Sequence, residues 1–158
     1  MTKIQQMRNT FDILKKNREY LLQLTNEYCF DDLNKIPHNF SNSIIWNMGH
    51  LLVTEKILLY GLSALEIPII TNEMIEFFKK GTHPKKYELN LWENIKDNFI
   101  SSIDRTESDF NRGIFINFTE YTTSIDVNLK NFEKTAQYIV LHEGIHTGVI
   151  QSIRKQFN

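Results

Sequence analysis

The stretch from Ile44 to Leu62 is apolar on most sides of the helix that its spacing predicts. Its large apolar residues are Ile44, Ile45, Trp46, Met48, Leu51, Leu52, Val53, Ile57, Leu58 and Leu59. A helix without a broad polar face is usually surrounded by other parts of the protein. Ser41, Asn42 or Ser43 can cap its N-terminus, and Gly61 lies near its end. The sequence therefore predicts a central helix, against which the rest of the chain packs.

Three further stretches have the spacing of amphipathic helices, with apolar residues three or four positions apart and charged residues between them. They run from Ile4 to about Glu27, from Leu89 to about Phe110, and from Ala136 to Ile153, the last one capped upstream by Asn131. Four such helices joined by short and longer connections are typical of a four-helix bundle. We therefore expect an all-α fold, with residues 1–158 forming a single domain.

The connections between these helices carry two weaker signals. Thr71 or Asn72 can cap a short extra helix that ends near Lys79. Residues 113–129 alternate apolar and polar residues and are rich in β-branched and aromatic types, which favours extended backbone. We expect a short hairpin or an extended crossover there, before the last helix.

Charge and composition narrow the class of partner. The 18 Lys and Arg residues nearly balance the 19 Asp and Glu residues, so no net field favours nucleic acid or an anionic membrane surface. Small molecules or other proteins are the expected partners. No apolar run approaches the roughly 18 residues of a membrane span, and the N-terminus lacks the apolar region of a signal peptide, so we expect a cytoplasmic protein.

Two histidines lie one helical turn apart in the last helix. His142 and His146 are four residues apart, which brings their Cβ atoms to roughly 5–6 Å on one helix face. A third histidine, His50, lies in the middle of the central helix. Burying an imidazole without a hydrogen-bonding or metal partner costs roughly 1–3 kcal/mol. Three interpretations of these histidines are therefore open: hydrogen-bonded core residues, unrelated surface residues, or ligands of one metal ion.

The letters His142-Glu143-Gly144-Ile145-His146 also spell the H-E-x-x-H signature of zinc peptidases, in which the glutamate is the general base. That class needs a further ligand downstream. No His, Glu or Asp follows His146, and the extended metzincin pattern would need Gly and His where Val149 and Ser152 stand. The sequence therefore argues against a peptidase. Cys29 is the only cysteine, so a cluster of thiolate ligands within one chain is excluded as well.

Three motifs together resemble the DinB-like superfamily, also called the DinB/YfiT-like or damage-inducible superfamily. They are Trp46-Asn-Met-Gly-His50-Leu, Tyr121-Thr-Thr-Ser, and His142-Glu-Gly-Ile-His146-Thr-Gly-Val-Ile. The resemblance implies an up-up-down-down four-helix bundle, often dimeric, that holds a divalent metal ion through three histidines. These correspond to His50, His142 and His146 in this sequence. The best understood relatives are thiol S-transferases that use low-molecular-weight thiols, and others are isomerases or hydrolases.

A three-histidine site leaves a divalent ion its full charge and at least one open position, as in catalytic sites. The ion would be Zn, Ni or Fe, because histidine-only sites accept several metals. We therefore expect a metal-dependent enzyme that activates a small thiol or water, with a non-enzymatic metal-binding or protein-interaction bundle as the alternative. Candidate catalytic residues are Glu143, Asn47 and Tyr121, although Glu143 could equally be an ordinary exposed residue, and candidate substrate-pocket residues are Trp46, Asn47, Thr122 and Thr123.

Overall fold

The structure is a computed structural model that describes residues 2–157, and it is mostly helical, as predicted. Its elements in chain order are α1 (Lys3–Thr25), α2 (Phe30–Asn34), α3 (Ile44–Lys56), the π-helical turn η1 (Ile57–Gly61), α4 (Asn72–Phe78), α5 (Leu89–Phe99), α6 (Ser101–Asn111), β1 (Tyr121–Thr122), β2 (Asn128–Leu129) and α7 (Phe132–Arg154). No helix of the described residues is both long enough and apolar enough to cross a membrane.

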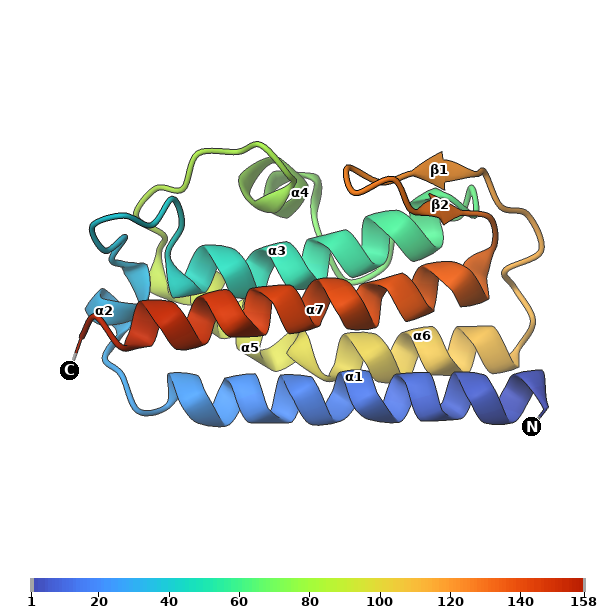
Figure 1. Cartoon of the computed structure of the whole chain (residues 1–158), viewed down its shortest axis with the longest axis horizontal. Coiled ribbons are helices and arrows are strands. Elements are labelled where there is room, and N and C mark those ends of the chain that lie inside the picture. The colour runs from blue at the N-terminus through green and yellow to red at the C-terminus, as the bar shows by residue number, and fades with distance from the viewer. Residues whose placement is uncertain (1, 158) are drawn as a thin grey trace.

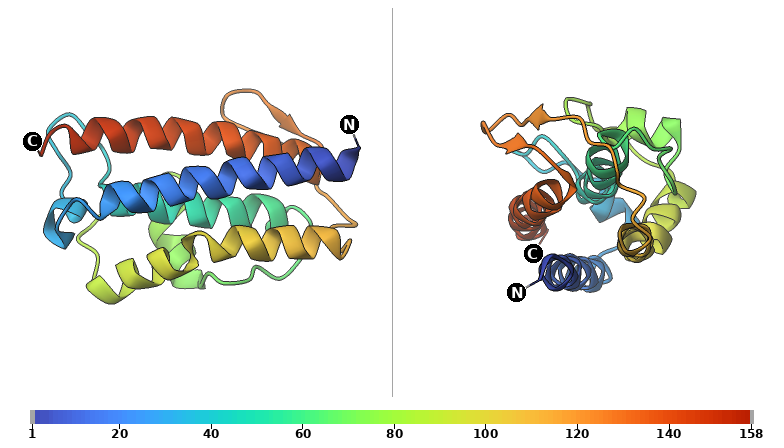
Figure 2. Two further views of the ribbon diagram at one scale, coloured as in Figure 1. Left: turned by 90° about the horizontal axis from the view of Figure 1, so that it is seen from below. Right: turned by 90° about the vertical axis from the view of Figure 1, so that its right-hand side faces the viewer.

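The long helices α1, α3 and α7 and the consecutive pair α5–α6 run side by side along the length of the molecule (Figures 1 and 2). Their directions differ from the expected up-up-down-down order, which is wrong for this chain. The connection from α1 to α3 stays at one end, so α3 runs back along α1, whereas the long connection that carries α4 returns α5 to the end where α3 began (Figure 1). The observed order is therefore up-down-down-up.

The central helix predicted from the sequence is α3 with its extension η1. The Ser43 side chain caps it by accepting a hydrogen bond from the Trp46 amide at 3.1 Å. Every residue of α3 except Thr54 is buried, which confirms the central position. The last helix is capped as predicted, since the Asn131 side chain accepts from the amide of Lys134 at 2.9 Å.

The single helix expected from Leu89 to Phe110 is instead two helices that meet at Ile100. The amide of Ile103 bonds to the Ile100 carbonyl at 2.9 Å, so the carbonyl of Phe99 lacks its usual partner from the next turn. Arg18 from α1 donates to that carbonyl at 2.7 Å. The break in the helix is therefore compensated by a buried arginine from another helix.

The helix α4 and the β1–β2 hairpin cover one side of the α3–α7 pair (Figure 1). The predicted short helix is α4, which the side chain of Thr71 caps at 3.2 Å from the amide of Met74. The predicted extended stretch forms a small antiparallel hairpin, in which Tyr121 pairs with Leu129. Both α4 and the hairpin lie on the side of α3 away from α1 (Figures 1 and 2).

Candidate metal centre

Three histidines from two helices converge between α3 and α7. His50 comes from α3, and His142 and His146 come from consecutive turns of α7. One ring nitrogen of each histidine lies within 4.8 Å of those of the other two, and the Nε2 atoms of His50 and His142 are 3.3 Å apart. The 3.3 Å separation suits one shared ion, because two nitrogens that each lie about 2.0–2.1 Å from an ion are at most about 4.2 Å apart.

The other ring nitrogen of His50 has a fixed partner. Nδ1 lies 2.6 Å from the backbone carbonyl oxygen of Phe78, the last residue of α4. A carbonyl only accepts hydrogen bonds, so Nδ1 carries the proton and Nε2 presents its lone pair to the other histidines. This is the usual arrangement of a metal-binding histidine and its supporting acceptor.

His146 has the same kind of support from Asn47. The Oδ1 atom of Asn47 lies 2.7 Å from Nδ1 of His146, and its amide nitrogen donates to the Ser43 carbonyl at 2.8 Å. Because the amide nitrogen of Asn47 donates to Ser43, the atom that faces the imidazole is the amide oxygen. Nδ1 of His146 is therefore a donor, and its Nε2 is unprotonated.

The Trp46 side chain packs against the histidine group. Its ring stacks on His50, with the ring centroids 4.6 Å apart and the planes at 11°. Its indole nitrogen donates to the hydroxyl of Thr82 at 3.0 Å, in the segment after α4. The stacking and this hydrogen bond hold the His50 ring at a fixed angle.

Burial keeps the three imidazoles neutral. It is the main reason that the pKa of His142 falls to about 4 and that of His146 to about 3, and the neighbouring histidines lower both further. Burial also lowers the pKa of His50. The group at pH 7 is therefore a set of neutral imidazoles, which is the form that binds metal ions.

Glu143 turns away from the histidines. It follows His142 on α7 and lies about 100° around the helix, so its side chain faces α1. Its Oε1 accepts from Nε and Nη2 of Arg18 at 2.9 and 2.6 Å, and its Oε2 accepts from Asn17 at 3.1 Å. The residue is 1% exposed, so the reading of Glu143 as an ordinary exposed glutamate is wrong.

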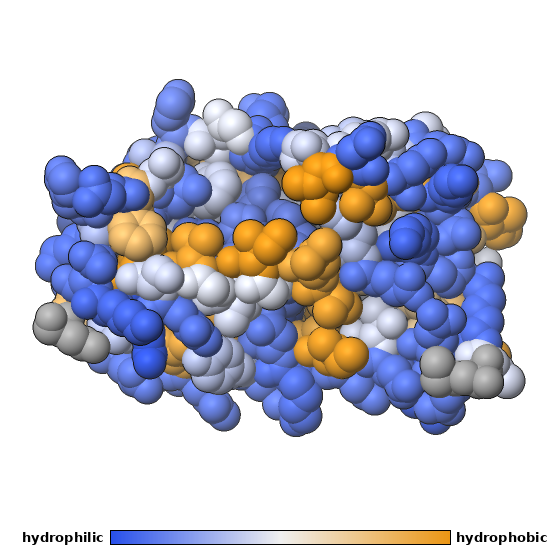
Figure 3. All heavy atoms as spheres, viewed as in Figure 1, coloured by the Kyte–Doolittle hydropathy of each residue, from blue (hydrophilic) through white to orange (hydrophobic). Residues whose placement is uncertain are grey.

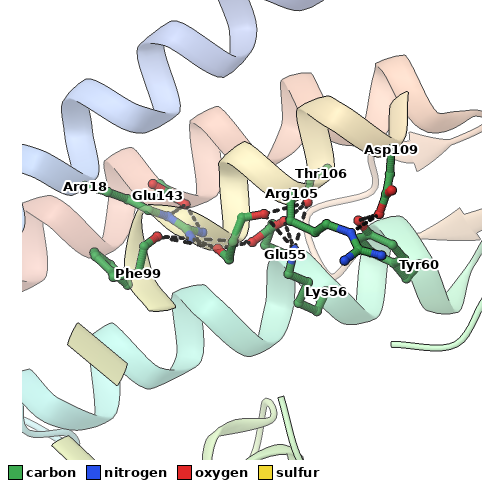
Figure 4. Close-up of polar contacts among 10 residues, drawn as sticks. Arg18, Glu55, Lys56, Tyr60, Phe99, Arg105, Thr106, Asp109 and Glu143 are labelled. Carbon is green, nitrogen blue, oxygen red and sulfur yellow. Dashed lines mark hydrogen bonds and ion pairs between the residues drawn. The ribbon is translucent and has the colours of Figure 1, made fainter. Parts of the chain in front are cut away.

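Arg18 and Glu143 belong to a buried polar network that sequence reasoning missed (Figure 4). Arg18 also donates to the hydroxyl of Ser102 at 2.6 Å, and that hydroxyl donates to Glu55 at 2.9 Å. Lys56 lies 3.0 Å from Glu55. One signal was present in the sequence: Arg18 stands four residues after Leu14 and three before Leu21, on the buried side of α1.

The hairpin places the other candidate residues at different depths. Tyr121 and Thr122 are exposed, whereas Thr123 is largely buried and its hydroxyl accepts from the amide of Val127 at 3.1 Å. Among residues 2–157, no hydrogen bond or ring contact joins any of the three to a histidine. Tyr138 on α7 is the aromatic neighbour of His142, with ring centroids 6.2 Å apart.

A sequence model of the DinB superfamily matches residues 13–150. The chain belongs to the DinB superfamily. The matched range contains all three histidines together with Trp46 and Asn47, so the resemblance seen in the motifs extends over most of the chain. No curated protein matches this member of the DinB superfamily. Membership and the three-histidine group are together compatible with metal binding.

Proposed function

We propose that this protein is a metal-dependent enzyme in which His50, His142 and His146 hold a divalent ion, Zn, Ni or Fe. The observation that carries the proposal is the convergence of three neutral imidazoles, two of which have their Nδ1 atoms held by acceptors. A bound ion would supply a positive charge that lowers the pKa of a water molecule to about 7 or deprotonates a thiol. The reaction is transfer of a small thiol to an electrophile, or hydrolysis of a small substrate.

The residues of the chain orient the ligands and shape the approach. Asn47 and the Phe78 carbonyl fix the ring positions of His146 and His50, and Trp46 blocks one side. Substrate contacts from Tyr121, Thr122 and Thr123 are part of this proposal. The hairpin region that carries them lies beside α3 on the same side as α4, whose last residue contacts His50 (Figure 1).

We further propose that the chain forms a single four-helix bundle domain. This domain pairs with a second copy of itself through α7. Apolar surface forms a row along this helix (Figure 3), where Leu141 and Ile145 are about half exposed. A Cβ atom built on Gly144 or Gly148 would meet nothing within 4 Å, so there is open space at both positions. A homodimer at this face would be weakened by Gly148→Glu, as measured by analytical ultracentrifugation.

One observation favours the alternative of a non-enzymatic metal-binding bundle. A surface pocket of about 430 Å³ lies between α4 and the start of α5, lined by residues such as Met74, Phe77 and Leu91, and it includes none of the three histidines. Substrate sites are usually concave. A ligand bound in this pocket, away from the three histidines, would suit a protein in which the ion supports the fold.

Cobalt substitution separates the two functions. The protein is loaded with Co²⁺, and a small thiol such as 2-mercaptoethanol is added while the near-ultraviolet absorption is recorded. The enzyme proposal predicts a thiolate-to-cobalt absorption band and thiol transfer to a bromobimane electrophile, both lost in His142→Ala. A protein that binds cobalt but shows neither the band nor turnover, even with hydrolysable esters, would favour the non-enzymatic alternative.

A further inference from the structure

The surface pocket between α4 and the start of α5 is separate from the histidine group. Its volume of about 430 Å³ falls within the range of small-molecule sites. Residues from both helices and from the segment that joins them line the pocket, and none of the three histidines is among them. A ligand that binds here therefore has no need of the proposed metal ion.

Apolar side chains line part of this pocket, and their packing holds them in place. Met74 is 3% exposed, and Phe77 and Leu91 are half-buried. The ring of Tyr87 packs against that of Phe77, with the centroids 6.3 Å apart. The Asn34 side chain bonds to the backbone N–H and carbonyl of Tyr87 at 2.9 and 3.2 Å. These contacts fix one wall of the pocket without a ligand.

An ammonium group already lies on the aromatic part of the pocket. The Nζ atom of Lys85 is 3.5 Å from the centre of the Phe77 ring. The face of an aromatic ring carries partial negative charge, which attracts cations. The Lys85 side chain is exposed and forms no ion pair within residues 2–157, so it can leave the ring without breaking a buried contact. The Phe77 ring thus offers a place for the cationic group of a ligand.

Two unpaired carboxylates line the same pocket. Glu73 belongs to the first turn of α4, and Glu88 immediately precedes α5 without capping it through its side chain. Within residues 2–157, neither side chain forms an ion pair or a hydrogen bond. Lys86, which also lines the pocket, lies 3.3 Å from Asp31. Exposed glutamates are usually only solvated. These two differ because they share a pocket with a ring that holds an ammonium group.

We propose that this pocket binds a small organic amine, whose ammonium group lies on the Phe77 ring in place of Lys85. The carboxylates of Glu73 and Glu88 complement its charge, and its apolar part packs against the apolar lining. Lys85 is then an internal competitor that occupies the ring when no ligand is bound. This site is independent of the metal ion and of the proposed reaction.

The first test compares three ligands of similar shape and different charge. Phenethylamine, phenethyl alcohol and 3-phenylpropionate are titrated into the metal-free, isotope-labelled protein, and the backbone amide resonances are followed by NMR. The amine should shift the amides of Met74, Phe77 and Leu91 and bind at least about fivefold more tightly than the alcohol, with a difference that shrinks as salt is added. Tighter binding of the propionate, or shifts only outside the pocket, would overturn the proposal.

Removal of Lys85 has opposite effects on an amine site and on an acid site. Lys85→Ala takes away both a competitor and a positive charge, so the amine should bind about threefold or more tightly than it binds the wild type. Lys80→Ala is the matched control, because it changes the net charge equally at an exposed residue that does not line the pocket. It should leave the dissociation constant nearly unchanged. Weaker binding of the amine by Lys85→Ala would contradict the proposed site.

The contribution of the carboxylates is measured with the double variant Glu73→Gln with Glu88→Gln. Both residues are exposed, so the fold should be retained, and affinity for the amine should fall about fivefold or more while affinity for the alcohol is unchanged. Glu76→Gln with Glu93→Gln is the control, since these exposed glutamates of α4 and α5 lie outside the pocket lining. Equal losses in the two double variants would overturn the role of Glu73 and Glu88.

Discussion

Gly49 and Phe78 approach so closely that no side chain fits between them. A Cβ atom built on Gly49 would lie 2.6 Å from two carbons of the Phe78 ring, which is itself fully buried. The backbone carbonyl of the same phenylalanine accepts from His50, the residue after Gly49. Glycine at this position therefore lets α4 come near enough to α3 to orient a candidate metal ligand.

Gly49→Ala should weaken metal binding without unfolding α3. The methyl group pushes Phe78 outward, and its carbonyl withdraws from Nδ1 of His50. Loss of such a supporting contact typically lowers metal affinity by about 10–100-fold. The affinity is measured by competition with a chromophoric chelator. The double variant Gly49→Ala with Phe78→Leu makes room for the methyl group and should recover most of the loss, and an unaltered affinity in the single variant would refute this role of Gly49.

Asn47→Ala should also weaken metal binding, because it removes the acceptor for Nδ1 of His146. The expected loss is again about 10–100-fold. Asn47→Asp keeps an oxygen at the same place and should retain much more of the affinity. The same competition titration applies, and equal affinities for the alanine and aspartate variants would show that the hydrogen bond does not matter.

Arg18→Met should strongly destabilise the fold. It leaves the buried carboxylates of Glu143 and Glu55 without the cation that lies 2.6 and 3.4 Å from them. Removing one partner of a buried ion pair costs about 3–5 kcal/mol. Lys16→Met is the control, since Lys16 forms an exposed ion pair with Glu19, for which a loss of at most about 1 kcal/mol is expected. Chemical denaturation measures both, and similar losses would contradict the importance of the buried network.

The metal-free protein should lose stability as the pH falls from 7 toward 4. His142 and His146 have a pKa of about 4 and about 3 in the folded state, against about 6.5 when unfolded, so protons bind the unfolded chain first. Each histidine contributes a slope of up to about 1.4 kcal/mol per pH unit in this window. The double variant His142→Gln with His146→Gln removes these groups and should show a flatter profile in denaturation measured at successive pH values. If the double variant loses stability with falling pH as steeply as the wild type, groups other than these two histidines cause the loss.

Helical spacing was sufficient to predict the relation between His142 and His146, because both lie on one helix. Whether this pair lies near His50 depends on how α3 and α7 pack, which helical spacing does not show. The family resemblance was needed to predict that the three histidines form one site. Burial of Arg18 was missed for a related reason: an arginine on an apolar face becomes a core residue only when another helix brings carboxylates to it. The directions of the helices depend on the routes of the connections, which periodicity does not encode.

The break in the helix at Ile100 was also not predicted, because it depends on a residue that is distant in the sequence. The residues around it continue the helical pattern, and only Arg18, from another part of the chain, provides the partner that the freed Phe99 carbonyl needs. Local signals were reliable where the interaction itself is local, as at the Asn131 and Thr71 caps.

The most direct test of the proposed metal site is the metal content of the purified protein and its single-histidine variants. After loading with Zn²⁺ and exhaustive dialysis, elemental analysis of the wild type should give about one ion per chain. His50→Ala, His142→Ala and His146→Ala should each lose most of the bound metal, whereas His38→Ala, at an exposed position outside the group, should retain it. Equal metal content in the wild type and in all four variants would contradict the three-histidine site.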